Sequence, residues 1–80
     1  MHPPRPAKTV PLPEAPSKGL CRVLEISSES DDVSRLKALG ICVDRKVQLV
    51  QSGDPLIVRV LGTRVGISRR LADVVLVQPI

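Results

Sequence analysis

The sequence predicts a small, mainly β domain in which one short α-helix packs on an antiparallel sheet. Three observations support this fold class. Residues 36–41 have the pattern of an amphipathic helix that ends at a glycine. Residues 53–55 (Gly-Asp-Pro) are typical of a tight turn, and the strand-like residues 56–60 follow directly. Several short strand-like segments at close spacing favour a barrel or a compact sandwich.

The composition limits the size and the location of this domain. The chain has 80 residues, which is enough for one domain. It contains no Phe, Tyr or Trp, so Val, Leu and Ile must fill the core. No apolar run is long enough for a membrane-spanning helix, and the N-terminus lacks the apolar stretch of a signal peptide. We therefore expect a soluble, cytoplasmic protein.

The N-terminal segment is rich in proline. Most of the eight prolines lie within residues 1–19, which therefore cannot form a helix or a central strand. We expect a disordered Pro-rich tail over residues 1–8 and one folded domain over residues 9–80. Three apolar residues could still lie extended along the edge of that domain, namely Val10, Leu12 and Ala15.

The first two predicted elements are a strand over residues 20–26 and a helix over residues 30–39. In the strand, Cys21 and Val23 share one face, but the alternation is imperfect and leaves the inner face undecided. Ser30 or Asp31 can cap the helix. Gly40 ends the helix because glycine adopts the left-handed conformation at little cost. The apolar stripe of this helix consists of Val33, Leu36 and Leu39.

Two predicted hairpins complete the sheet. Residues 46–51 alternate polar and apolar side chains, which is typical of a half-buried strand, and residues 56–60 are expected to form the strand that pairs with it. We expect the inner face to be formed by Val47, Leu49, Leu56, Val58 and Val60, with Arg59 pointing to solvent. A second turn is predicted at Gly62-Thr63. The remaining elements are a strand over residues 64–68, a helical turn over residues 68–73 and a closing strand over residues 74–77.

The reactive side chains give little support for catalysis or metal binding. The only histidine is His2, in the tail, so no histidine can activate Cys21, Cys42 or a serine as a nucleophile. The two cysteines do not have the spacing of a metal site, and the carboxylates of the domain do not cluster in the sequence. There is no Gly-rich phosphate loop. We therefore expect no enzymatic activity, no cofactor and no metal ligands.

The charge pattern argues against nucleic-acid binding. The formal net charge is +4, but half of it lies within residues 1–18 and the remainder is a mixture of nine basic and seven acidic residues. Nucleic-acid binding usually needs clustered Lys and Arg, and single strands usually need aromatic side chains on which bases stack. The chain offers neither in its sequence, so no nucleic acid is expected as a partner.

The order of the helix end, the turn and the later strands resembles a known family. The residues that carry the resemblance are Leu36, Leu39, Gly40, Ile41, Gly53, Asp54, Pro55, Val58, Val60, Gly62, Val65, Ile67, Ala72, Val75 and Val77. In this order and spacing, residues 12–77 resemble the ferrous iron transport protein A (FeoA) family. The chain departs from that pattern at Val43-Asp44 and at Pro16-Ser17, where the family usually has Pro-Gly. Asp tolerates the left-handed conformation, so the turn at Val43-Asp44 is expected to survive.

The resemblance implies a small SH3-like β-barrel with one short α-helix. It also implies a cytosolic accessory role in Fe(II) uptake, in which the protein binds or regulates FeoB, a membrane transporter with a cytosolic GTPase domain. The alternative is a regulatory or adaptor barrel of the kind found at the C-terminus of iron-dependent repressors, or a weak nucleic-acid-binding module.

Five residues are candidates for contact with the partner: Leu36, Lys37, Leu39, Arg69 and Arg70. The two leucines could form an exposed apolar groove together with Ile41, or they could be core residues that fix the helix. The three basic residues could meet an acidic partner, or they could belong to an ordinary solvated surface. An edge of the barrel could instead accept a strand from the partner. Weak self-association is a further option.

Overall fold

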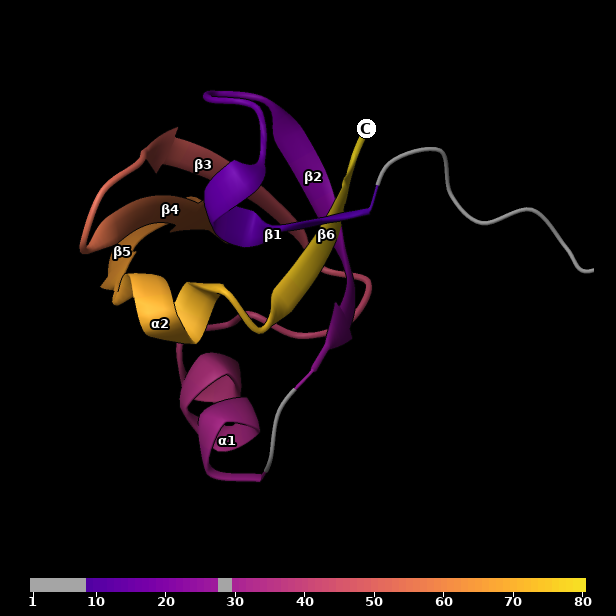
Figure 1. Cartoon of the computed structure of the whole chain (residues 1–80), viewed down its shortest axis with the longest axis vertical. Coiled ribbons are helices and arrows are strands. Elements are labelled where there is room, and N and C mark those ends of the chain that lie inside the picture. Colours follow the sequence, from indigo (N-terminus) through magenta and orange to yellow (C-terminus); the bar gives the residue numbers. More distant parts are fainter. Residues whose placement is uncertain (1–8, 28–29) are drawn as a thin grey trace, which may run out of the picture.

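The computed structural model describes residues 9–27 and 30–80, so the predicted disordered tail of residues 1–8 lies outside the described residues. The described part contains a curled six-stranded antiparallel sheet with the strand order β1-β6-β2-β3-β4-β5 (Figure 1). The elements along the chain are β1 (Val10–Pro11), the 3-10 helix η1 (Leu12–Glu14), β2 (Leu20–Ile26), α1 (Ser30–Ala38), β3 (Lys46–Gln51), β4 (Leu56–Val60), β5 (Thr63–Ile67), α2 (Arg69–Ala72) and β6 (Val75–Pro79). The predicted mainly β class with a short helix is confirmed.

The central hairpin of β3 and β4 forms because both strands bury one face. The register places Val47 opposite Val60 and Leu49 opposite Val58, so the apolar side chains of the two strands meet on the inside of the sheet. Leu56 continues the same buried face. The predicted bounds and inner faces of these two strands are confirmed.

The core is aliphatic throughout. Its fully buried side chains come from β2, α1, β3, β4, α2 and β6, from Ile41 in the loop after α1, and from the N-terminal segment, where η1 contributes Leu12. Among the described residues, no polar or charged side chain is buried. The N-terminal segment lies along the domain edge as expected, because Val10 and Pro11 pair with β6 and Ala15 joins the core.

A bulge in β2 explains why the sequence did not identify the inner face of this strand. Cys21 and Val23 are completely buried and therefore define that face. The pairing of β2 with β6 shifts register between Val23 and Glu25. The extra residue lets Arg22 and Glu25 both reach solvent, although strict alternation would place them on opposite faces.

The C-terminus of α1 is closed by a Schellman motif. Gly40 has a φ of +91°, and its N–H donates a hydrogen bond to the carbonyl of Lys37 at 2.9 Å. The N–H of Ile41 donates to the carbonyl of Leu36, also at 2.9 Å. The predicted end of the helix at Gly40 is confirmed. The helix begins at Ser30, next to residues 28–29, which are not described, so capping by Ser30 or Asp31 stays a prediction.

Two turns differ in how well the sequence located them. Asp44 adopts a φ of +72°, and its N–H donates to the carbonyl of Val23 at 2.7 Å, so the turn at Val43-Asp44 survives as expected. The hairpin turn predicted at Gly62-Thr63 is wrong by one residue. Leu61 and Gly62 occupy the turn with φ values of 54° and 79°, and Thr63 already pairs with β4.

The Gly-Asp-Pro turn is tied to α2 by a hydrogen bond. The Oδ1 atom of Asp54 accepts a hydrogen bond from the backbone N–H of Arg69 at 3.1 Å. Ser68 caps the same helix, because its Oγ atom accepts from the N–H of Leu71 at 3.1 Å. The predicted helical turn over residues 68–73 is confirmed, and Asp54 has a structural role there.

Candidate partner-binding groove

The side chains that could hold a metal do not gather in the described residues. Within residues 9–27 and 30–80, no group of three or more His, Cys, Asp or Glu side chains has the arrangement of a metal site. None of the helices in this part of the chain has the length and apolar content that a bilayer crossing needs. Desolvation by burial raises the pKa of the Cys21 thiol, which keeps it neutral inside the core.

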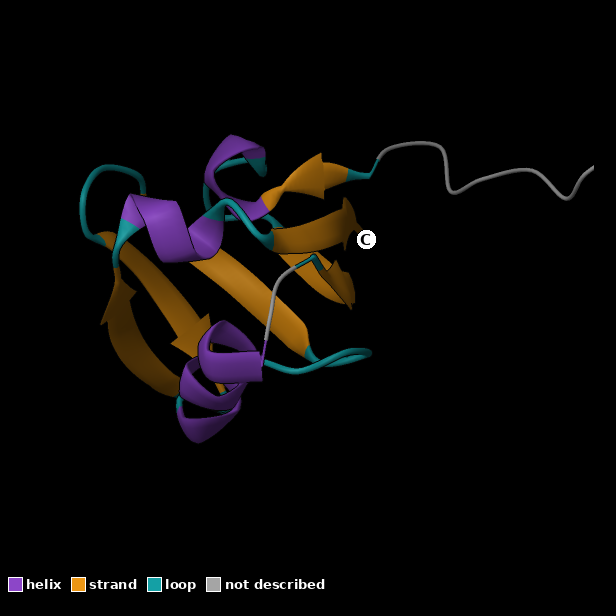
Figure 2. Cartoon of the chain, turned by 60° about the horizontal axis from the view of Figure 1, so that its bottom comes forward, coloured by secondary structure: helices purple, strands orange, loops and turns teal. Residues whose placement is uncertain are grey.

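An apolar groove lies between α1 and the end of β2. In the cartoon the helix α1 lies below the sheet (Figures 1 and 2). The cavity there has a volume of about 480 Å³. Its lining residues are Leu24, Glu25, Ile26, Val33, Lys37, Cys42 and Val43.

Local backbone geometry gives this groove its apolar lining. The β2 bulge leaves Leu24 and Ile26 half-buried rather than wholly inside the core. Val33 of α1 is also half-buried, and Val43 on the following loop is 51% exposed. Because apolar surface in a contiguous, partly exposed hollow is typical of interaction sites, this groove is a candidate binding surface.

The charges at the rim of the groove balance one another. Lys37 comes from α1 and Glu25 from β2, and both side chains are exposed. The groove therefore carries no net charge of its own, and an apolar side chain or helix face is the ligand that its lining suits best. The lining also contains the Cys42 thiol, and no histidine is among its residues.

The five predicted partner residues do not form one site. Leu36 has no exposed surface and belongs to the core, as does Ile41, while Leu39 is half-buried and packs against the core. The predicted alternative of a groove formed by these three side chains is therefore corrected: the groove exists, but other residues line it. The helix stripe folds inward because the Schellman motif turns Ile41 back onto the core.

The three basic candidates lie in different places. Lys37 lines the groove, whereas Arg69 and Arg70 are exposed on α2 and are not part of it. Whether these side chains contact a partner stays a prediction. Leu24, Ile26 and Val43 were not among the predicted partner residues, and the imperfect alternation of β2 was the signal that could have indicated an unusual surface there.

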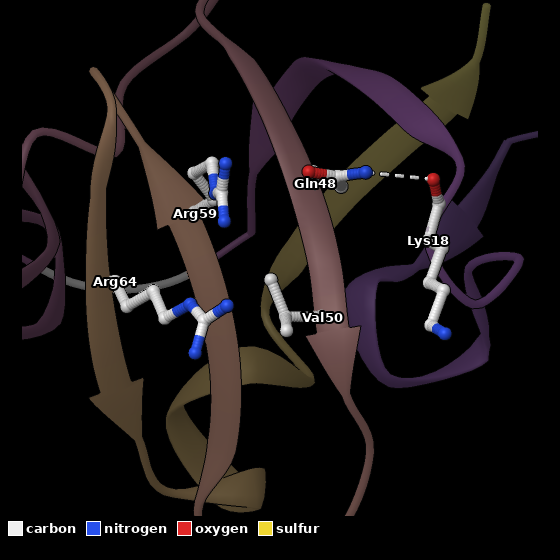
Figure 3. Close-up of a pocket in the computed structure, with 5 residues that line it drawn as sticks. All are labelled: Lys18, Gln48, Val50, Arg59 and Arg64. Atoms are coloured by element: carbon white, nitrogen blue, oxygen red, sulfur yellow. Dashed lines mark hydrogen bonds between the residues drawn. The ribbon is translucent and has the colours of Figure 1, made fainter.

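A second hollow lies on the outer face of the sheet. Its volume is about 250 Å³, and its lining residues are Lys18, Gln48, Val50, Arg59 and Arg64 (Figure 3). The sequence analysis predicted only that Arg59 is exposed. The hollow depends on strand register, which places Arg59 of β4 directly opposite Arg64 of β5.

Comparison with known families and structures gives consistent results. A family model described as "FeoA domain" matches residues 10–79 of the chain. No curated protein sequence matches the chain. A crystal structure titled as an iron uptake regulatory protein (FeoA) is similar, with a TM-score of 0.86 and 27% identity over 91% of this chain and 99% of that one.

Two further solved structures share the fold at lower identity. Iron(II) transport protein A from Clostridium thermocellum has a TM-score of 0.83 and 16% identity over 89% of this chain and 46% of that one. The IdeR protein of T. acidophilum has a TM-score of 0.84 and 20% identity over 98% of this chain and 37% of that one. The chain thus spans less than half the length of these two proteins. The likeness confirms the predicted SH3-like β-barrel.

Proposed function

Because the chain belongs to the FeoA domain family, which is linked to ferrous iron transport, we propose that it is an accessory protein of Fe(II) uptake. In this role it binds the cytosolic part of the FeoB membrane transporter and regulates it, acting in the cytoplasm. The observation that supports the proposal is the apolar groove between α1 and β2.

The groove is suited to an apolar anchor from the partner. Val43 is 51% exposed, so burying its remaining exposed half contributes about half of the roughly 1.5–3 kcal/mol that a fully exposed side chain of this type would gain. Leu24, Ile26 and Val33 add partly exposed apolar area on the other walls. A helix or loop of the partner that places one or two apolar side chains in this hollow would bury this apolar area in the complex.

Regulation through this surface works by a shift in the partner's conformational equilibrium. In this role the protein acts by binding one conformation of the transporter more tightly than another. A tenfold difference in affinity between two conformations corresponds to about 1.4 kcal/mol of differential binding. Loss of a single apolar contact in the groove is of this size.

The test is a calorimetric titration, in which the cytosolic domain of the transporter is added to the purified chain and the heat of binding is measured. The unmodified chain should bind saturably. Val43→Asp places a charge on the exposed wall of the groove and should weaken binding at least tenfold, at about 1.4 kcal/mol per factor of ten. Leu61→Asp is the matched control, because Leu61 is 71% exposed and does not line the groove.

The control should bind like the unmodified chain. Absence of saturable binding, or equal weakening by both variants, would contradict the proposal. The alternative of a nucleic-acid-binding module is tested by adding double-stranded DNA at several salt concentrations. Tight DNA binding with a steep dependence on salt would favour that alternative.

A further inference from the structure

A cluster of basic side chains covers the outer face of the sheet, and the groove does not involve it. The antiparallel register places Arg22 opposite Lys46 in one row and Arg59 opposite Arg64 in a second row. Gln48 lies in the second row, two residues along β3 from Lys46, so both rows project from the same face. We call the surface formed by Lys18, Arg22, Lys46, Arg59 and Arg64 the basic face.

Acidic residues are scarce in the strands that carry the basic face. The sequences of β3, β4 and β5 contain no Asp or Glu. Glu25 follows the β2 bulge and Asp44 precedes β3, so both carboxylates lie beyond the ends of the paired rows. Like charges directly opposite each other in adjacent strands oppose folding. The two like-charged pairs on this face therefore do not stabilise the fold, which suggests that they serve binding instead.

The second row surrounds a hollow that suits a phosphate group. Figure 3 shows Arg59 on β4, the side chain of Arg64 reaching from β5 across β4, and Val50 between β4 and β3. The amide of Gln48 donates a hydrogen bond to the Lys18 carbonyl at 2.8 Å, which ties the Lys18 segment to β3. Arg and Lys are donors only, so the missing partner is an anion with several acceptor oxygens.

Backbone hydrogen bonding fixes Lys18 at the edge of this hollow. Its N–H donates to the carbonyl of Leu49 at 2.7 Å. Lys18 also has a φ of +64°, a conformation that side chains other than Gly, Asn and Asp rarely adopt. Hydrogen bonds through the N–H and through the carbonyl of Lys18 therefore both fix its backbone. The point from which the cationic side chain extends is thus fixed beside the hollow before a ligand binds.

We propose that the basic face docks the protein on an anionic bilayer surface, with a lipid phosphate in the hollow beside Arg59 and Arg64. This choice of ligand rests on the proposed function, because the partner named there is embedded in a membrane. Lipid molecules move laterally in the bilayer, so their phosphates can take up positions opposite cations that are spread over four strands. Stacking on nucleic-acid bases would need aromatic side chains, and the chain has none.

Both proposed contacts can form at the same time. None of the residues of the basic face lines the groove between α1 and β2. A protein held on the bilayer through its sheet would keep the groove free for the transporter. Docking would also raise the effective concentration of the protein near a membrane-embedded partner.

The test is sedimentation of the chain with lipid vesicles, in the absence of the transporter. Vesicles of phosphatidylcholine containing phosphatidylglycerol should bind the protein, and raised salt should release it. Arg59→Gln/Arg64→Gln should weaken binding roughly 30-fold, because each basic side chain near an anionic surface contributes about a factor of five. Arg69→Gln/Arg70→Gln removes the same charge from α2 and should cost less than about threefold.

Three results would overturn the proposal. Equal sedimentation with vesicles of phosphatidylcholine alone would exclude recognition of the anionic lipid. Equal weakening by the two double variants would indicate attraction by net charge alone. Binding of inorganic phosphate or double-stranded DNA that depends on Arg59 and Arg64, without binding to anionic vesicles, would assign the face to a different ligand. Since no transporter is present, each of these results leaves the groove contact untouched.

Discussion

Leu36→Ala tests whether the stripe of α1 is part of the core. The Leu36 side chain has 0% exposure and is surrounded by aliphatic neighbours. Truncating a buried leucine costs about 2–5 kcal/mol, and the cost is higher where the site cannot collapse. The helix is held at its C-terminus by the hydrogen bond from Ile41 to Leu36 and cannot easily move to fill the cavity. We therefore expect a loss of about 3 kcal/mol or more.

Such a loss is large for this chain. At about 0.05–0.15 kcal/mol per residue, 80 residues give a free energy of unfolding of roughly 4–12 kcal/mol. A loss of about 3 kcal/mol lowers the Tm by roughly 12–24 °C. Urea and thermal unfolding followed by circular dichroism would measure both quantities. Leu61→Ala makes the same chemical change at a side chain that is 71% exposed, and it should shift the free energy of unfolding by less than about 0.5 kcal/mol. A Leu36→Ala variant as stable as this control would refute the reasoning.

Four further predictions concern the backbone, the turn and the thiols. Gly40→Ala should lower the free energy of unfolding in urea by about 1–2 kcal/mol, because φ is +91° there and a Cβ would lie 3.2 Å from Val60 Cγ1. The control is Gly66→Ala, where a Cβ meets only ordinary contacts, and it should lower the free energy of unfolding by less. Equal losses in the two variants would contradict this prediction. Asp54→Ala should lose about 0.5–2 kcal/mol through the hydrogen bond to α2, whereas Asp54→Asn should retain most of it. A thiol reagent should modify Cys42 before the buried Cys21, and faster labelling of Cys21 in the folded protein would show that the core is not closed there. Burial raises the Cys21 pKa from its ordinary value of 9.0. The stability that this neutral thiol contributes should therefore be fully present below pH 9.0 and should be lost as the pH rises through the folded-state pKa. Measuring the free energy of unfolding at several alkaline pH values tests this.

The strands that bury one face could be predicted closely from the sequence. The bounds of β3 and β4 agree with the alternation of Lys46–Gln51 and Leu56–Val60, because a one-residue slip would expose the whole apolar set. The end of α1 was also predictable, since the residue after a helix often adopts the left-handed conformation and glycine, here Gly40, is favoured at that position. In these elements the local signal and the tertiary packing agree.

The errors arose where tertiary structure overrides the local signal. The hairpin turn includes Leu61 at a φ of 54°, which a side chain of this type seldom adopts, so the sequence pointed to Gly62-Thr63 instead. The groove depends on the β2 bulge, which changes the direction of Leu24 and is decided by pairing with β6. The basic face depends on the register between strands distant in sequence. Neither surface could be read from spacing alone.

The binding surface for the transporter is tested most directly by an NMR titration of the isotope-labelled chain with the transporter's cytosolic domain. The account predicts saturable shifts of backbone amides in three segments that border the groove, namely the end of β2, α1 and the loop around Val43. Residues of α2 and the hairpin tip at Leu61 should keep their positions in the spectrum. Saturable shifts confined to α2 or to the sheet face, with the groove unaffected, would contradict the account.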